Sequence, residues 1–560
     1  MRDASKFAAP LGMSSFRDLR RAGATYVDKT ASIAAVLRAP VPVVLFPRPR
    51  RFGKTLWMST LAAWVEPGAG DGEALFGDLA IWQDEGAQAH RGRHPVVSLT
   101  FKDVKHRTWD ECRNALAAVM VEAFRVHRSL LAQLAADGRE QFAALLAGRA
   151  DQATLEQSLK TLTGALASHH GAQVVLLIDE YDSPLHAAYV HGYYDEAITF
   201  FRNLLSAALK DNPALFRGVL TGILRVAKES IFSGLNKLIV YSMLDPTQAD
   251  AFGFTESEVV SLAAQAGASG RLDEIRAWYD GYRFGGVTIF NPWSVLNFLA
   301  HQPPDPAPYW VNTASDDLIR RLLVEQGPAT LAELEALVAG DAIEEAIDEH
   351  IVLREVDRRR EALWSFLVFT GYLTPVALRR EGTRFAARLR VPNAEVLALY
   401  RDLFRRWMDA RIAPGYRVED LLAALIAGDA EAVEWLLTGM LVEHWSYHDT
   451  GRGLGEAVYH AFVIGLLVRL ADDYRVESNR EAGFGRADVL ITPRRPGRPG
   501  VVLELKVPRG KSAEATLADA MDQLAARRYA EELRARGAGS VVEFGIVFDG
   551  KRAWVARRFA

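Results

Sequence analysis

The sequence predicts an α/β fold with a parallel central sheet, because two apolar runs of strand length each end at a polar turn. The first run covers residues 43–46 and leads into a basic turn, and the second covers residues 174–178 and leads into two acids. Uninterrupted apolar runs of this length suit strands that are buried on both faces of a parallel sheet. Residues 108–169, which lie between them, are rich in Ala and Leu with a helical period.

The first turn has the residues of a phosphate-binding loop. It runs Arg-Pro-Arg-Arg-Phe-Gly-Lys-Thr from Arg48 to Thr55. Free backbone N–H groups at the start of the following helix, together with the helix dipole, attract phosphate. Lys54 is expected to reach the terminal phosphates of ATP, and the Thr55 hydroxyl to hold Mg²⁺. The general motif has glycine at the position of Arg48, so the tight turn must be built differently here.

The second turn supplies the acids that such a site needs. Ligands of parallel sheets lie beyond the carboxyl ends of the strands, which is where Asp179 and Glu180 fall. Asp179 is expected to contact Mg²⁺, directly or through water, and Glu180 to orient and deprotonate the attacking water. The alternative is a buried strand that ends in a solvated acidic turn.

A third strand, expected at residues 217–220, ends at Thr221. A polar residue at that point can sense the terminal phosphate, and Thr221 is assigned this role. Arg225 or Lys228 is expected to stabilise charge on the transferred phosphoryl group. The alternative for all three is a turn followed by a surface base.

Together these stretches resemble the AAA-ATPase-like family of bacterial and archaeal proteins. The resemblance rests on residues 26–30, 48–55, 178–182, 221–225 and 291–294. It implies a P-loop NTPase domain that binds ATP and Mg²⁺, and Arg48 agrees with this family although it departs from the general motif. The candidate nucleotide-binding residues are Arg50, Arg51, Phe52, Gly53, Lys54, Thr55, Asp179, Thr221 and Arg225.

The chain is expected to contain four segments. Residues 1–245 form the P-loop domain, residues 246–385 a helical or winged-helix lid, residues 386–439 a helical connector and residues 440–560 a nuclease-like domain. The aromatic cluster at 278–284 is interpreted as the core of the lid rather than a surface for stacking on bases.

The last segment carries a second set of catalytic residue types. Asp488 opens one expected strand, and the next contains Glu504 and Lys506. Side chains two positions apart share a face of a strand, so an acid from the neighbouring strand can meet them there. Carboxylates bind Mg²⁺ or Mn²⁺ through hard oxygen ligands, and the metal activates water against a phosphodiester. Lys506 is expected to position that water or to stabilise the charge of the transition state.

This pattern resembles the PD-(D/E)XK nuclease superfamily. Glu456, on an expected helix, is a third candidate metal ligand beside Asp488 and Glu504, and Gln523 occupies a helix position that such nucleases use to support the site. Ala487 stands where the superfamily name has proline, a position that varies freely. The alternative is a nuclease-like fold that has lost activity.

The leading functional hypothesis is an ATPase whose nucleotide cycle gates a magnesium-dependent nuclease acting on DNA. The alternatives are a nucleotide-switched module that binds nucleic acid or protein without cutting, and a signalling ATPase with an inert tail. The net charge of −4 excludes a global basic field, so nucleic-acid contacts must come from local patches. The single cysteine, Cys112, excludes an internal disulfide and favours the cytoplasm. No apolar run approaches the ~20 residues of a membrane span, and a homo-oligomer is possible.

Overall fold

The computed structural model describes residues 7–560 except 69, 135, 226–236, 302–304, 311–332, 335, 339, 352, 357, 383, 410–417, 445–458, 460–461, 464–465, 468–469, 471–472, 483–484 and 509. The chain divides into two compact units. One comprises residues 1–318 and 344–396, and the other residues 319–343 and 397–560. The finer division into four segments stays a prediction.

A five-stranded sheet is the centre of the first unit. Its strands are β1 (Val43–Pro47), β2 (Val96–Thr100), β3 (Val174–Asp179), β4 (Leu215–Gly222) and β5 (Leu238–Val240). The order is β2-β3-β4-β1-β5 and every neighbouring pair is parallel. Both β1 and β3 are buried along their whole length, as their apolar runs predict. The parallel α/β class is therefore confirmed.

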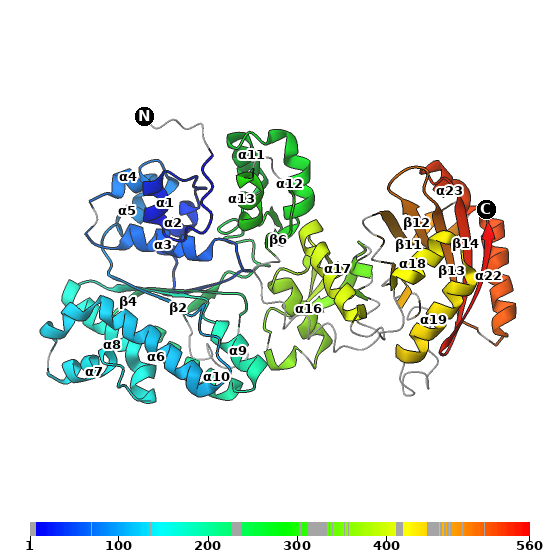
Figure 1. Cartoon of the computed structure of the whole chain (residues 1–560). Helices are drawn as coiled ribbons and strands as arrows, with labels where there is room; N and C mark the ends of the chain where they lie inside the picture. The colour runs from blue at the N-terminus through cyan, green and yellow to red at the C-terminus, as the bar shows by residue number, and fades with distance from the viewer. Residues whose placement is uncertain are drawn as a thin grey trace. The chain divides into compact units, whose positions relative to one another are not determined.

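Helices cover both faces of this sheet (Figure 1). One group consists of α1 (Phe16–Ala22), α2 (Thr30–Leu37), α3 (Lys54–Val65), α4 (Gly72–Phe76) and α5 (Glu85–Gln88). The other consists of α6 (Trp109–Val126), α7 (Ala136–Leu146), α8 (Gln152–His170), α9 (Ser183–His191) and α10 (Tyr194–Leu209). The helical insertion expected at 108–169 is formed by α6, α7 and α8. Because α3 follows β1 directly, the phosphate loop lies at the carboxyl edge of the sheet.

The rest of the first unit combines helices with two small sheets. Its helices are α11 (Glu256–Gln265), α12 (Leu272–Tyr279), α13 (Pro292–Ala300) and α16 (Arg360–Phe369), and β6 (Tyr282–Phe284) pairs with β7 (Val287–Ile289). A three-stranded sheet has the order β8-β10-β9, from β8 (Ile343–Ile347), β9 (Thr374–Glu381) and β10 (Arg384–Arg390). Tyr279, Tyr282 and Phe284 are buried, as expected for core aromatics. The helix expected at 316–323 lies outside the described residues.

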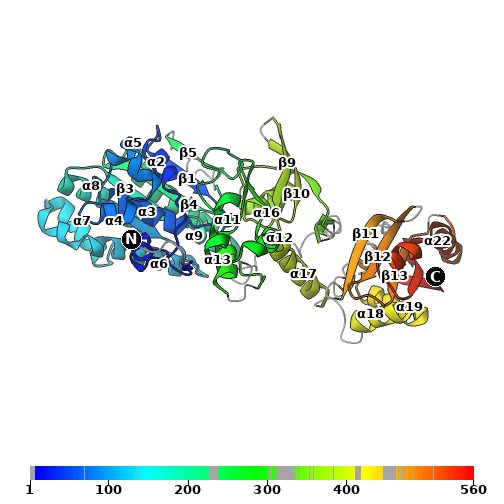
Figure 2. The ribbon, with the colours of Figure 1, turned by 90° about the horizontal axis from the view of Figure 1, so that it is seen from above.

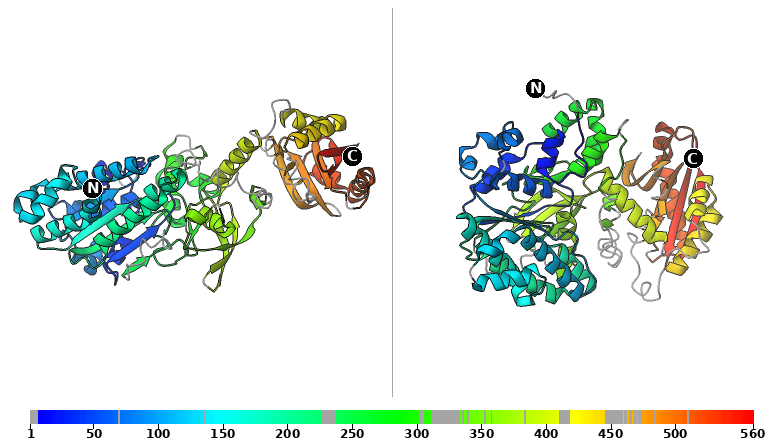
Figure 3. Two further views of the ribbon diagram at one scale, coloured as in Figure 1. Left: turned by 90° about the horizontal axis from the view of Figure 1, so that it is seen from below. Right: turned by 60° about the vertical axis from the view of Figure 1, so that its left-hand side comes forward.

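The second unit contains a mixed five-stranded sheet. Its strands, in sheet order, are β11 (Tyr474–Ala482), β12 (Gly485–Pro493), β13 (Gly500–Lys506), β14 (Val541–Asp549) and β15 (Arg552–Phe559). Only β13 and β14 are parallel among these neighbours. α18 (Val418–Ala427) and α19 (Ala430–His444) cover one face, and α22 (Ala513–Arg527) and α23 (Tyr529–Ala535) cover the other (Figure 3). α17 (Ala394–Asp409) precedes them in the chain.

The period of two along β12 and β13 decides which residues meet α22 and α23. Leu490 and Val502 pack in a cluster with Leu524 and Tyr529. Since side chains alternate between the faces of a sheet, Asp488 and Glu504 are directed to this same face.

Candidate active sites

The phosphate loop joins β1 to α3 through a strained turn. Arg51 has φ 67° and Gly53 has φ 87°, so both adopt the left-handed conformation that favours glycine. Gly53 is the N-cap of α3 and supplies no side-chain bond to the first turn of this 12-residue helix. The N–H groups of that turn are therefore left for an anion, which fits a phosphate.

Lys54 is folded back on its own loop. Its Nζ donates to the carbonyl oxygens of Arg48 at 3.0 Å and Pro49 at 2.9 Å. Burial lowers the pKa of Lys54, and the charges of Glu180 and Asp179 act in the opposite direction. To reach a phosphate, the ammonium group must exchange these carbonyl oxygens for phosphate oxygens.

Asp179, the last residue of β3, contacts Thr55 in α3, which follows β1, and Thr221 in β4. Its Oδ2 accepts a hydrogen bond from Thr55 Oγ1 at 2.5 Å, and its Oδ1 accepts one from Thr221 Oγ1. The order β3-β4-β1 brings these residues together although 124 positions separate Thr55 from Asp179. A hydroxyl and a carboxylate are the hard oxygen ligands that Mg²⁺ prefers, so this donor set fits the ion.

Glu180 and Asp182 follow β3 in a compact turn. Glu180 has φ 51° and accepts a hydrogen bond from Ser183 Oγ at 3.0 Å. Asp182 is buried and accepts from the backbone N–H groups of Ile223 at 2.8 Å and Leu224 at 2.9 Å. Asp182 therefore holds the chain that leaves Thr221.

Asp182 had no role in the sequence-based expectation. Burial by itself would raise its pKa, but His186 and the two N–H groups together hold the pKa below its usual range. The carboxylate is therefore kept charged inside the fold. The sequence feature that could have pointed to Asp182 is its position three residues after Asp179, within the stretch that carries the family resemblance.

Arg48 stands where the general motif has glycine, and its side chain is buried and anchors the loop through hydrogen bonds. Its Nη1 donates to the carbonyl oxygens of Pro47 at 3.0 Å and Tyr241 at 2.6 Å, and its Nη2 donates to that of Gln248 at 3.1 Å. Burial lowers its pKa to about 9. Its guanidinium also lies over the rings of Phe252 and Phe284.

The remaining loop residues also contact the segment after β5. The Arg51 guanidinium lies 4.4 Å from the ring centroid of Trp293. Phe52 is buried, and its ring packs against those of Tyr282 and Phe284 at 5.0 and 5.2 Å. The carbonyl oxygen of Arg50 accepts from Trp310 Nε1 at 3.2 Å. The loop is thus clamped to the segment expected to form the lid.

Arg225 lies after β4, beyond Thr221. Burial lowers its pKa, and the charges of Glu349 and Tyr181 act in the opposite direction. Lys228, the alternative base for this role, lies outside the described residues.

The second candidate site lies on β12 and β13. Asp488 Oδ2 accepts from the backbone N–H of Leu505 at 2.7 Å, and Lys506 Nζ lies 2.6 Å from Glu504 Oε1. Burial and the charge of Asp488 raise the pKa of Glu504 to about 7, against the opposite effect of Lys506. Glu504 Oε2 is buried and has no hydrogen-bond partner among the described residues. A buried carboxylate oxygen without a partner fits a hard metal ion.

The helical face adds groups around Glu504. Gln523 and Arg527 lie on α22, and Tyr529 begins α23. Burial and the charge of Glu504 raise the pKa of the Tyr529 phenol, while hydrogen bonds from Arg527 and Gln523 lower it. The sequence analysis named Gln523 as a candidate but not Arg527 or Tyr529, since neither belongs to the Asp and Glu-x-Lys pattern.

The described residues supply two of the three expected metal ligands. Glu456 lies outside them, and among the described residues no three His, Cys, Asp or Glu side chains gather as a metal site. Asp488 and Glu504 are the carboxylates that could hold Mg²⁺ or Mn²⁺.

Comparison with known proteins finds a family match for each of two regions of the chain. A family model described as a predicted AAA-ATPase matches residues 10–232, and a model of the PD-(D/E)XK nuclease superfamily matches residues 454–558. A protein of Azotobacter chroococcum mcd 1, named "Uncharacterized protein in vnfD 5'region", is 30% identical over 539 residues, or 95% of this chain and 95% of that relative. The chain belongs to the AAA-ATPase-like family.

The residues of the two candidate sites fall within separate matched regions of this AAA-ATPase-like protein. The first match contains the phosphate loop, Asp179, Glu180 and Thr221, and the second contains Glu456, Asp488, Glu504, Lys506 and Gln523. The expected combination of an AAA-ATPase-like domain and a PD-(D/E)XK nuclease-superfamily domain is confirmed. Within the described part of the chain, no helix has both the length and the apolar character to span a bilayer.

Proposed function

We propose that this protein binds and hydrolyses ATP, and that its ATPase module gates a magnesium-dependent nuclease acting on DNA. The observation that carries the proposal is the presence of two separate phosphate-chemistry sites on one chain. Asp179 joins Thr55 and Thr221 in one of them, and Asp488, Glu504 and Lys506 converge in the other. A cytoplasmic location is part of the proposal and is supported by the single cysteine.

At the first site, Lys54 binds the terminal phosphates and Thr55 and Asp179 hold Mg²⁺, which neutralises charge on the phosphates. Glu180 orients the attacking water and takes its proton. Thr221 senses the terminal phosphate through Asp179, and Arg225 stabilises the charge of the transferred group. Arg50, Arg51, Phe52 and Gly53 shape the loop around the phosphates.

The gating is supported by the contacts of the phosphate loop. Lys54 bonds the carbonyl oxygens of Arg48 and Pro49, and must leave them to bind a phosphate. The Arg48 side chain is held by Tyr241 and Gln248, and the Arg50 carbonyl oxygen by Trp310. A movement of the loop on nucleotide binding therefore reaches the segment that follows β5.

At the second site, Asp488, Glu504 and Glu456 hold Mg²⁺ or Mn²⁺, which polarises the phosphodiester and lowers the pKa of a bound water. Lys506 positions that water or stabilises the charge of the transition state. Gln523 supports this arrangement from α22, beside Tyr529 and Arg527.

The test uses the purified full-length protein with linear and circular DNA, with and without ATP, Mg²⁺ and chelator. We expect Lys54→Met and Glu180→Gln to abolish ATP turnover, and Asp488→Asn and Lys506→Met to abolish cleavage while ATP turnover persists. Lys105→Met and Lys511→Met remove the same charge at exposed positions and are expected to behave as the wild type.

Two outcomes would overturn the proposal. Cleavage by the Asp488→Asn protein would remove the nuclease assignment. DNA binding without cleavage under any divalent metal would favour a nucleotide-switched binding module with an inactive nuclease-like domain.

A further inference from the structure

The hairpin formed by β9 and β10 has a charge opposite to that of the chain as a whole. Residues 374–390 contain five arginines and one glutamate, whereas the complete chain has a net charge of −4. All five arginines, Arg379, Arg380, Arg384, Arg388 and Arg390, are exposed. Figure 2 shows the hairpin extending away from α16. It is thus a local basic patch on a projecting element.

The strand register gathers three of these arginines on one face. Arg379 pairs with Ala386, Arg384 with Glu381, and Arg388 with Ala377. Residues that pair across an antiparallel ladder point to the same side of the sheet. The two alanines are too short to cover the neighbouring arginine side chains, so these side chains stay exposed on this face.

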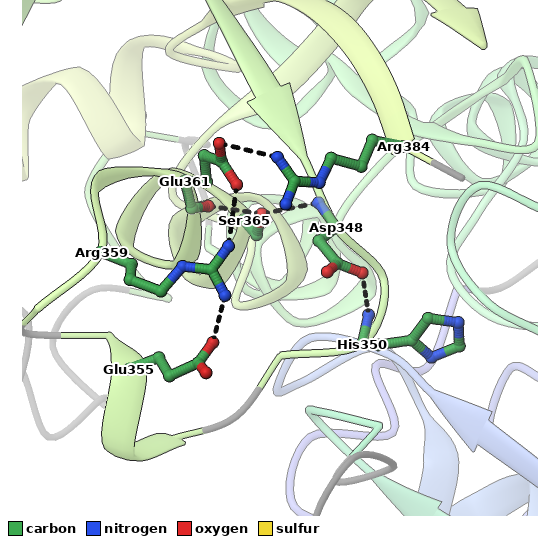
Figure 4. Close-up of polar contacts among 7 residues, drawn as sticks. All are labelled: Asp348, His350, Glu355, Arg359, Glu361, Ser365 and Arg384. Carbon is green, nitrogen blue, oxygen red and sulfur yellow. Dashed lines mark hydrogen bonds and ion pairs between the residues drawn. The ribbon is translucent and has the colours of Figure 1, made fainter. Parts of the chain in front are cut away.

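Buried residues fix the base of the hairpin, and one ion pair ties the end next to its turn to α16. Thr374, Ala387 and Leu389 are buried, and Arg384 Nη1 lies 2.9 Å from Glu361 Oε1 on α16. Figure 4 shows Arg384 reaching Glu361, which also contacts Arg359. The hairpin is therefore a firmly attached ribbon rather than a loose loop.

Two acids form ion pairs with arginines of this face, and β8, the neighbour of β10 in the sheet, carries Glu344 and Glu345 as well. Glu381 pairs with Arg379 and Glu361 with Arg384, and exposed pairs of this kind contribute little, so a stronger anionic partner can displace them. Arg388 forms no ion pair with any residue that the structure describes. At least one arginine, and up to three on this face, can therefore bind an external anion.

We propose that the β9–β10 hairpin binds the sugar-phosphate backbone of duplex DNA. This inference rests on the proposed function in one respect only, namely that DNA is the substrate. A two-stranded β-ribbon fits the major groove of B-DNA, and the planar guanidinium group binds phosphate with two donors at once. Phosphate contacts position a protein on DNA without reading its sequence. The hairpin thereby gives a protein of negative net charge a local hold on its substrate.

The test measures binding of the full-length protein to a mixed-sequence DNA duplex in chelator, which prevents cutting, over a series of salt concentrations. Each phosphate contact contributes about 0.9 to the slope of log affinity against log salt. Replacing Arg379, Arg384 and Arg388 together by Gln is expected to weaken binding by about 10- to 100-fold and to lower the slope by about 3. The double variant Arg379→Gln/Arg388→Gln leaves the Glu361 pair intact and is expected to lower the slope by about 2.

The matched control replaces three exposed arginines in or next to the helical insertion, Arg107, Arg128 and Arg149, by Gln. It removes the same charge and is expected to leave the slope within about 1 of the wild-type value. The inference fails if the hairpin variants bind duplex DNA as the wild type does, or if polyglutamate competes as well as duplex DNA for the hairpin. Hairpin-dependent binding without cleavage by the wild type in Mg²⁺ would instead remove the proposed nuclease and leave this inference standing.

Discussion

Trp310 Nε1 donates a hydrogen bond to the carbonyl oxygen of Arg50, 3.2 Å away. The backbone N–H of Trp310 in turn donates to Glu395 Oε1 at 2.5 Å, and Ser294 Oγ donates to Glu395 Oε2 at 2.8 Å. Glu395 is fully buried. A single carboxyl group therefore holds the tryptophan that contacts the phosphate loop.

Glu395→Gln is expected to change how stability depends on pH. Burial raises the pKa of Glu395 from 4.5 to about 7, so the folded protein binds a proton that the unfolded chain releases. Its stabilising contribution is complete below about pH 4.5 and is lost as the pH rises through 7. At 1.36 kcal/mol per pKa unit the loss is about 3 kcal/mol. The variant lacks this loss, so its stability relative to the wild type should rise between pH 5 and 8 in urea unfolding.

The control for this pH effect is Glu196→Gln, the same change at an exposed position. It should leave the pH profile of the free energy of unfolding as it is in the wild type. Equal profiles for the wild type and Glu395→Gln would show that the carboxyl group does not titrate in this range.

Arg48→Gly restores the glycine of the general phosphate-loop motif, yet we expect it to destabilise the protein. The change removes a charged donor from the carbonyl oxygens of Pro47, Tyr241 and Gln248 and leaves a cavity. Unsatisfied buried acceptors cost about 1–3 kcal/mol each, so we expect a loss of roughly 3–5 kcal/mol in the free energy of unfolding. Urea unfolding measures it.

Arg51→Gly is the matched control for this loss. Arg51 is exposed and has φ 67°, a conformation that glycine adopts without strain. We expect its stability to stay within about 1 kcal/mol of the wild type. A smaller loss for Arg48→Gly than for Arg51→Gly would contradict the role of Arg48 as a buried anchor.

The sequence was sufficient to predict those elements whose pattern lies within a short stretch of neighbouring residues. The apolar runs at 43–46 and 174–178 predicted buried parallel strands, and the polar residues after them lie together at the carboxyl edge of the sheet. The period of two placed Glu504 and Lys506 on one face of β13, where they contact each other. In each case neighbouring residues alone determine the result.

Features that depend on distant residues could not be predicted. Tyr241 and Gln248, which accept hydrogen bonds from Arg48, lie 193 and 200 positions after it in the chain. The residues next to Arg48 in the sequence therefore do not indicate that it is buried. β8 has the sequence Ile-Glu-Glu-Ala-Ile, in which two adjacent acids obscure a strand pattern. The link from Glu395 through Trp310 to Arg50 likewise exists only after folding.

Gly222→Ala is expected to disturb the chain that follows Thr221. An added Cβ would lie 2.7 Å from both Asp182 Oδ1 and Tyr181 Cε1, closer than real contacts allow. The Asp182 carboxylate must then move away from the backbone N–H groups of Ile223 and Leu224, which donate hydrogen bonds to it. Overpacking of this kind costs about 1–3 kcal/mol, and we also expect a lower rate of ATP hydrolysis, measured by phosphate release.

Gly164→Ala provides the control, because Gly164 lies inside α8 with no atom near its added Cβ. Alanine is favoured over glycine in a helix by about 1 kcal/mol. This variant should be as stable as the wild type or more so, with unchanged ATP hydrolysis. Wild-type stability and ATP hydrolysis in Gly222→Ala would show that the turn tolerates the added methyl group.

Tyr529→Phe is expected to weaken DNA cleavage while ATP hydrolysis persists. The phenol lies beside Glu504 and is hydrogen-bonded by Gln523 and Arg527, which lose their partner in the variant. Groups that orient metal ligands typically contribute 10- to 100-fold to activity or metal affinity, so a rate about 10-fold lower is expected, with more Mg²⁺ needed for half-maximal cleavage. Tyr474→Phe makes the same change at a buried tyrosine near Arg498 and Asp473, and should cut DNA normally. If Tyr529→Phe has the metal requirement and rate of the wild type, its hydroxyl has no part in positioning Glu504.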